Sequence, residues 1–94
     1  MLANIDCDAV VVVVNRKQTY AIAKDIFEAG LHLLTEKPMA QTHSAAIQLA
    51  DLSKEKGVIY SVGFMRRYDS GVLKAKDLID LYRENGDLGK IISV

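Results

Sequence analysis

The 94-residue sequence lacks several features that would place it in particular classes of protein. Cys7 is its one cysteine, which excludes an internal disulfide and a metal site built on paired cysteines, and fits a reducing compartment. Twelve basic residues balance twelve acidic ones, so no net charge is available to hold nucleic acid or an anionic membrane. The longest unbroken apolar run, residues 9–14, is shorter than the roughly 18 residues of a membrane span, and no basic stretch precedes it as in a signal peptide. We therefore expect a cytoplasmic protein without a metal, nucleic-acid or membrane partner.

What the sequence contains is typical of a globular chain, with 50% hydrophobic and 26% charged residues. The usual size of a domain is about 100 to 150 residues. The chain is slightly shorter, so it can supply one small domain or part of a larger one.

The hydrophobic pattern alternates between strand and helix. Residues 8–14 are rich in valine without alternating, which predicts a strand buried on both faces of a parallel sheet. Further strands are predicted over residues 31–35, 58–62 and 91–94, and helices over residues 18–29, from the N-cap Thr42 to Gly57, and over residues 69–85. This order predicts an α/β fold with a parallel sheet of about three strands and right-handed crossover helices.

A sheet of this kind has open edges. A valine-rich strand at an edge is a pairing or aggregation hazard, so we expect a strand to be missing beside residues 10–14. The isolated chain is then expected to self-associate, and Val12→Lys is expected to increase its solubility by charging the edge.

Two polar segments follow predicted strands. Glu36-Lys37-Pro38 comes after the second strand and residues 63–69 come after the third, so both are expected at the carboxyl edge of the sheet, where open α/β sheets bind ligands. A lysine there can hold a ribose or substrate hydroxyl or take part in proton transfer. Two alternatives stay open: Lys37 is a solvated turn residue, and Arg67 pairs with Asp69 while Phe64 and Met65 pack.

Six segments, in this order and spacing, resemble the Gfo/Idh/MocA family of NAD(P)-dependent sugar and polyol oxidoreductases, which includes glucose-fructose oxidoreductase and inositol dehydrogenases. They are Asp8-Ala9 before the valine-rich strand, Glu28-Ala29-Gly30, Leu34-Thr35-Glu36-Lys37-Pro38-Met39-Ala40, Glu55-Lys56-Gly57, Val62-Gly63-Phe64-Met65-Arg66-Arg67-Tyr68-Asp69, and Gly86-Asp87-Leu88-Gly89-Lys90-Ile91. The resemblance covers essentially the whole chain.

The resemblance implies a Rossmann NAD(P)-binding domain joined to a larger α/β substrate domain, whose open sheet often forms an oligomer interface. Residues 1–64 then correspond to the later part of the Rossmann domain, a partial Rossmann fold that lacks the first βαβ unit with the glycine motif. Residues 65–94 correspond to the connecting helix and the first strand of the substrate domain.

The resemblance also assigns site residues. It makes Lys37 the catalytic residue, near the nicotinamide and the reacting hydroxyl, and implies that the Lys37–Pro38 peptide, often cis in the family, aims the lysine at the site. The expected contacts with NAD or NADP are Glu36, Lys37, Pro38 and Asn15. The expected contacts with the substrate are Met65 and Arg66.

The sequence departs from the family in several places. The family's Thr-Pro after the valine-rich strand is Val14-Asn15 here, and its nearby His is Thr19. No G-x-G-x-x-G follows a strand, so the turn that cradles the diphosphate is missing, together with the residue that selects NAD or NADP. The family's Asp-x-x-x-His, with the acid/base histidine, would lie beyond Val94.

Two functions follow from this pattern. The first is part of an NAD(P)-dependent oxidoreductase that transfers hydride from a sugar or polyol hydroxyl to nicotinamide, and that is inactive as the isolated chain. The alternative is a non-catalytic association module, which pairs through its open sheet with another copy, another chain or the missing part of the enzyme.

Overall fold

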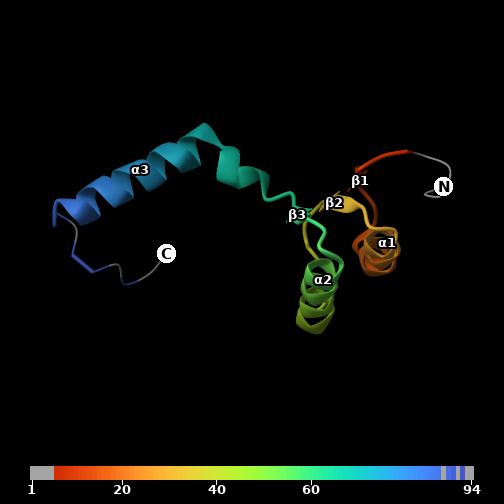
Figure 1. The fold of residues 1–94 in the computed structure, drawn as a ribbon. Coiled ribbons are helices and arrows are strands. Elements are labelled where there is room, and N and C mark those ends of the chain that lie inside the picture. The colour runs from red at the N-terminus through yellow and green to blue at the C-terminus, as the bar shows by residue number, and fades with distance from the viewer. Residues whose placement is uncertain (1–5, 88, 91, 93–94) are drawn as a thin grey trace. The chain divides into compact units, whose positions relative to one another are not determined.

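The computed structural model describes residues 6–87, 89, 90 and 92, and divides the chain into two compact units, Met1–Phe64 and Met65–Val94. The first unit contains β1 (Ala9–Val12), α1 (Arg16–Glu28), β2 (His32–Thr35), α2 (His43–Lys56) and β3 (Tyr60–Val62) (Figure 1). The strands form one parallel sheet in the order β1-β2-β3. The predicted α/β class with a small parallel sheet is confirmed.

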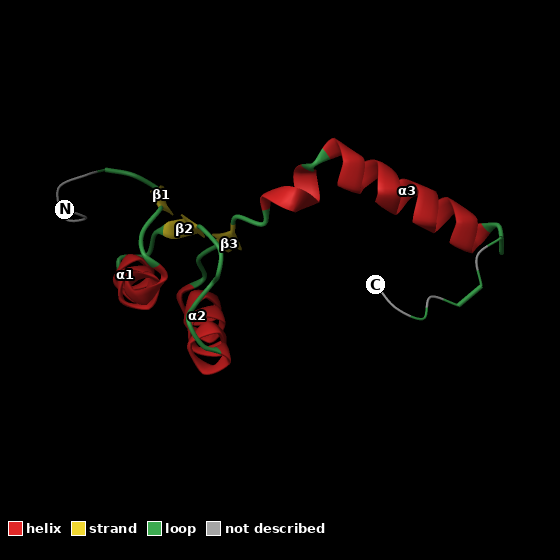
Figure 2. Cartoon of the chain, turned by 180° about the vertical axis from the view of Figure 1, so that it is seen from behind, coloured by secondary structure: helices red, strands yellow, loops and turns green. Residues whose placement is uncertain are grey.

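Both helices of this unit lie on the same face of the sheet, as the two opposite views in Figures 1 and 2 show. They bury a core made of Val12, Ala23, Ile26, Phe27, Leu33 and Leu49. The chain passes across the sheet in one direction, from β1 to β2 to β3, and both connecting helices lie on the same face. The two strand–helix–strand connections therefore have the same hand.

The opposite face of the sheet is not covered by a helix in the described part of this unit. Val11 is 69% exposed, and Leu34, its partner in the ladder, is 40% exposed. The prediction that the valine-rich strand is buried on both faces is therefore wrong. A run of β-branched residues favours a strand, whereas burial of each face depends on what other elements cover it. Val12 is 8% exposed and faces the core, so Val12→Lys would bury a charge instead of charging an edge.

The strands are shorter than predicted, and at the start of the third strand the backbone N–H groups form other hydrogen bonds in place of the bonds of the sheet. The backbone N–H of Val58 donates to the carbonyl of Ser53, at the end of α2, and the N–H of Ile59 donates to Nδ1 of His32, at 3.1 Å. The third strand therefore begins at Tyr60 instead of residue 58. The first strand ends at Val12, because the chain turns after Val14 to start α1.

The ends of α2 and the end of α1 match the predicted signals, whereas α1 begins at Arg16, two residues earlier than predicted. Thr42 caps α2, with its Oγ1 accepting a hydrogen bond from the N–H of Ala45 at 3.2 Å. Gly57 ends that helix at φ 66°, in the left-handed region that favours glycine. Gly30, just after α1, has φ 75° for the same reason.

The second unit contains a short 3-10 helix, η2 (Met65–Tyr68), followed by α3 (Ser70–Glu84). Asp69 is the N-cap of α3, and the helix ends before Asn85 and Gly86, as predicted. The strand predicted over residues 91–94 falls mostly outside the described residues, which include only Ile92 of the four. No helix within the described ranges is long and apolar enough to cross a membrane.

Candidate active site at the carboxyl edge of the sheet

The carboxyl ends of the three parallel strands meet at one edge of the sheet. The N–H of Glu36, the first residue after β2, donates to the carbonyl of Val12 at 3.4 Å, and the N–H of Gly63, after β3, donates to the carbonyl of Thr35 at 2.8 Å. Residues 36–38 therefore leave the sheet from a strand that is held on both sides. This is the position at which open α/β sheets bind ligands.

Glu36 and Lys37 both have exposed side chains at this edge. Oε2 of Glu36 accepts a hydrogen bond from the N–H of Lys37 at 3.1 Å, and the Lys37–Pro38 peptide is cis, as the family resemblance implies. Within the described ranges Lys37 takes part in no ion pair. Its ammonium therefore offers three donors, and the carboxylate of Glu36 offers acceptors, to a ligand that carries hydroxyl groups. The catalytic role of Lys37 stays a prediction.

Gly63 allows β3 to end close to this segment. A Cβ atom added to Gly63 would lie 3.3 Å from the carbonyl oxygen of Thr35 and 3.9 Å from Oε1 of Glu36. The first of these distances is tighter than ordinary van der Waals contact. The absence of a side chain at Gly63 thus keeps the end of β3 against the start of the Glu36–Lys37 turn.

Asn15 lies in the loop after β1, at the start of α1. Its side chain caps this helix, with Oδ1 accepting a hydrogen bond from the N–H of Lys17 at 3.1 Å. The described contact is thus a structural one, and the expected contact between Asn15 and the cofactor stays a prediction.

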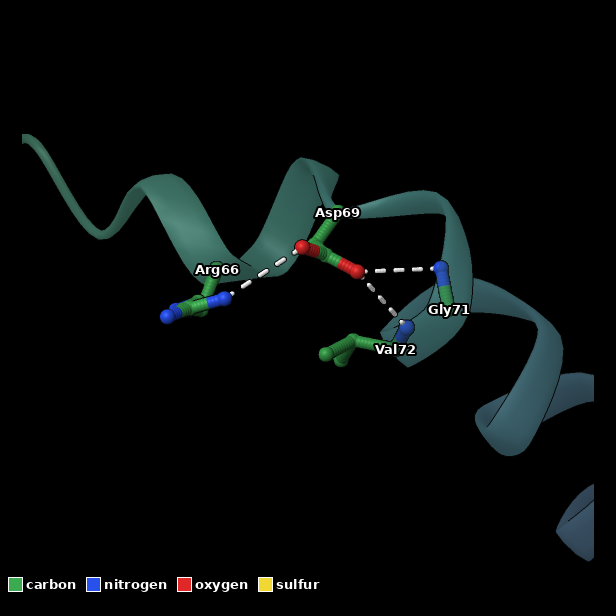
Figure 3. A network of polar contacts seen from close by, with 4 residues as sticks. All are labelled: Arg66, Asp69, Gly71 and Val72. Atoms are coloured by element: carbon green, nitrogen blue, oxygen red, sulfur yellow. Dashed lines mark hydrogen bonds and ion pairs between the residues drawn. The ribbon is translucent and has the colours of Figure 1, made fainter.

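Met65 and Arg66 belong to the second unit, in η2, where both are exposed. Arg66 forms an ion pair with Asp69, with Nη1 3.4 Å from Oδ2, while Oδ1 of Asp69 accepts from the N–H groups of Gly71 and Val72 (Figure 3). The pairing with Asp69 that the sequence suggested for Arg67 is thus made by Arg66. Arg66 lies three residues before Asp69 and its side chain is 84% exposed, so the ion pair leaves it accessible. The roles of Met65 and Arg66 in substrate binding stay predictions.

Tyr60 is the first residue of β3, and the sequence did not reveal that its hydroxyl contacts residues on either side of the Glu36–Lys37 turn. Its ring packs against Phe27, with 5.1 Å between ring centroids. Its hydroxyl also lies 3.2 Å from Oγ1 of Thr35 and donates to the carbonyl of Met39 at 3.1 Å. The sequence did hold one indication of these contacts: the inward-facing strand position is a tyrosine and not a phenylalanine, and a hydroxyl inside a protein needs a hydrogen-bond partner.

The histidines and acidic residues do not form a metal site in the described part of the chain, where no three possible ligands gather. His32 instead has a structural contact, since its Nδ1 accepts from the N–H of Ile59.

Comparison with known proteins identifies the family. Residues 1–64 match the Gfo/Idh/MocA family, described as an oxidoreductase family with an NAD-binding Rossmann fold. An inositol 2-dehydrogenase/D-chiro-inositol 3-dehydrogenase from Lacticaseibacillus casei is 39% identical over 82 residues, which are 85% of this chain and 23% of that protein. A D-xylose dehydrogenase from Paenarthrobacter nicotinovorans is 38% identical over 74 residues, 79% of this chain and 18% of that protein.

A solved structure gives the same answer. The myo-inositol 2-dehydrogenase from Lactobacillus plantarum superposes with a TM-score of 0.82 and 32% identity, over 97% of this chain and 26% of that protein. The chain thus spans about a quarter of the length of these relatives. The matched segment includes the whole sheet and the Glu36–Lys37 turn at its carboxyl edge. The chain belongs to the Gfo/Idh/MocA family of oxidoreductases.

Proposed function

We propose that this chain forms part of an NAD(P)-dependent oxidoreductase that oxidises a hydroxyl group of a sugar or polyol. The observation that carries the proposal is the Glu36-Lys37 pair at the carboxyl end of the central strand, with both side chains exposed. Family membership supports the oxidoreductase class, and relatives named for inositol and D-xylose support a substrate rich in hydroxyl groups.

The proposal gives each residue a chemical role. The Lys37 ammonium donates a hydrogen bond to the reacting hydroxyl and acts in a proton relay, giving one of its own protons to solvent as it takes up the proton that this hydroxyl loses. Met65 and Arg66 border the substrate pocket, and the guanidinium of Arg66 offers fixed donors to substrate hydroxyls.

The residues at this edge fit one end of a nicotinamide dinucleotide. The donors of Lys37 and the acceptors of Glu36 suit the hydroxyls of a ribose, and Asn15 and Pro38 are the further cofactor contacts that we propose. The chain has no G-x-G-x-x-G turn, so the diphosphate must be held by other parts of the enzyme. When bound, the nicotinamide supplies the acceptor for the hydride.

Substitution of Lys37 tests this proposal in a complete oxidoreductase that contains the chain, for example one built by replacing the matching quarter of the Lactobacillus plantarum dehydrogenase. Lys37→Ala should lower turnover with myo-inositol or D-xylose by about a hundredfold or more, since proton transfer by a positioned side chain contributes 10²–10⁴. The melting temperature should stay close to that of the parent, because an exposed lysine contributes little packing.

Lys56→Ala is the matched control, because Lys56 is also an exposed lysine of the first unit but ends α2, away from the Glu36–Lys37 turn in the chain. It should leave turnover unchanged. A lowered melting temperature with unchanged turnover in Lys37→Ala would mean that Lys37 is structural, and would refute its catalytic role.

A non-catalytic association module remains the second candidate, favoured by the uncovered sheet face around Val11 and Leu34. Titration with NADH separates the two functions. The complete oxidoreductase should bind NADH with micromolar affinity, whereas a module that acts only by pairing should not bind it at all.

A further inference from the structure

The hydroxyl of Tyr60 contacts the chain on both sides of the segment that carries Lys37. On one side it lies 3.2 Å from Oγ1 of Thr35, the last residue of β2, and on the other it donates to the carbonyl of Met39 at 3.1 Å. Residues 36–38 thus form a short loop whose two flanking residues, Thr35 and Met39, are joined through one hydroxyl group.

The direction of both hydrogen bonds follows from the number of protons available. A tyrosine hydroxyl carries one proton, and a carbonyl oxygen can only accept, so Tyr60 gives its proton to Met39. The hydroxyl of Thr35 must then donate to the oxygen of Tyr60. Thr35 is only 3% exposed, so neither water nor another orientation readily replaces this contact.

The ring of Tyr60 connects this bridge to the core. It packs edge-on against Phe27, at an interplanar angle of 65°, and Phe27 is fully buried. Burial raises the pKa of Tyr60, which keeps the hydroxyl protonated and able to donate, although the hydrogen bond with Thr35 opposes the rise. The hydroxyl is therefore carried by a ring that packs on the core, while Lys37 is exposed.

We propose that Tyr60 is a positioning residue for Lys37: by binding Thr35 and Met39 at once, its hydroxyl fixes the conformation of residues 36–38 and thereby the place of the lysine at the carboxyl edge. This inference rests on the proposed function of Lys37. It predicts that Tyr60 affects catalysis through Lys37 and in no other way.

A double-mutant cycle in the complete oxidoreductase tests this. Tyr60→Phe keeps the ring against Phe27 but removes both hydrogen bonds, and should lower kcat roughly tenfold. In the Lys37→Ala background the same substitution should cause no further loss. An equal fractional loss in both backgrounds would overturn the proposal, because a merely structural role would act whether or not the lysine is present.

Hydrogen exchange gives a second readout that does not depend on activity. In Tyr60→Phe the amides of residues 36, 37 and 39 should exchange roughly tenfold faster. Tyr20→Phe is the matched control, since the Tyr20 hydroxyl bonds Gln48 between α1 and α2, and it should leave these amides unchanged. Unchanged exchange in Tyr60→Phe would show that the hydroxyl does not hold the segment, and would overturn the proposal.

A third variant covers the case in which Tyr60→Phe fails to fold. Thr35→Val has nearly the same shape and removes one of the two bonds, so it should give a smaller change in kcat in the same direction. If Lys37→Ala left turnover unchanged, the proposed function would fail as well. Loss in Lys37→Ala without loss in Tyr60→Phe or Thr35→Val would refute only the role of Tyr60.

Discussion

Burial raises the pKa of Tyr60 above its ordinary value of 10.0, and the hydrogen bond with Thr35 partly opposes this rise. A raised pKa means that the folded chain keeps the phenolic proton more tightly than the unfolded chain does. The resulting stabilisation is complete below about pH 10 and is lost as the pH rises through the pKa of the folded state.

The stability advantage of the parent over Tyr60→Phe should therefore shrink above about pH 10. Urea unfolding of the complete oxidoreductase at pH 8 and at pH 10.5 measures this difference. A constant difference across this pH range would count against burial as the cause.

Single residues of the site differ in how far the sequence reveals them. Glu36, Lys37 and Pro38 form a contiguous motif, so their place at the carboxyl edge follows from counting the strands before them. Tyr60 lies 23 residues after Lys37, and its link to the motif depends on the parallel register that pairs Leu33 with Tyr60. No local pattern states that register, so the contacts of the Tyr60 hydroxyl could not be predicted from the sequence.

At the scale of elements, the N-cap of α2 should contribute measurably to stability. Thr42 satisfies the N–H of Ala45, so Thr42→Ala should lower the free energy of unfolding by about 1 kcal/mol. Ser44→Ala, an exposed change in the same helix, serves as control and should have an effect within about 0.5 kcal/mol. Equal effects of the two changes in urea unfolding would show that the cap is not used.

The helices were easier to predict than the strands. Thr42, Gly57 and Asp69 are chemical signals that act within one turn of the chain, so the helix ends follow from local sequence. The end of a strand depends on where its partner turns away, and the burial of its faces depends on distant elements. The valine-rich segment accordingly gave the right strand but the wrong burial, with Val12 inside and Val11 exposed.

At the scale of the whole molecule, β1 has an unpaired outer edge among the described residues. Val11 and Val13 are 69% and 74% exposed, so apolar side chains lie beside unpaired backbone donors and acceptors. Such an edge is a template for pairing with a second chain. Self-association of the isolated chain therefore stays a prediction. A charge that opposes it must be placed at an exposed residue such as Val11, not at the buried Val12.

The isolated 94-residue chain should self-associate at micromolar concentrations, and Val11→Lys should shift it toward monomer, because it charges the exposed face without entering the core. Val12→Lys is the informative contrast. It places an ammonium group in a core position that is 8% exposed, so it should unfold the first unit and increase aggregation. Sedimentation velocity with circular dichroism measures both effects. A compact, cooperatively melting parent monomer would show that β1 needs no partner, since the three strands and two helices would then suffice.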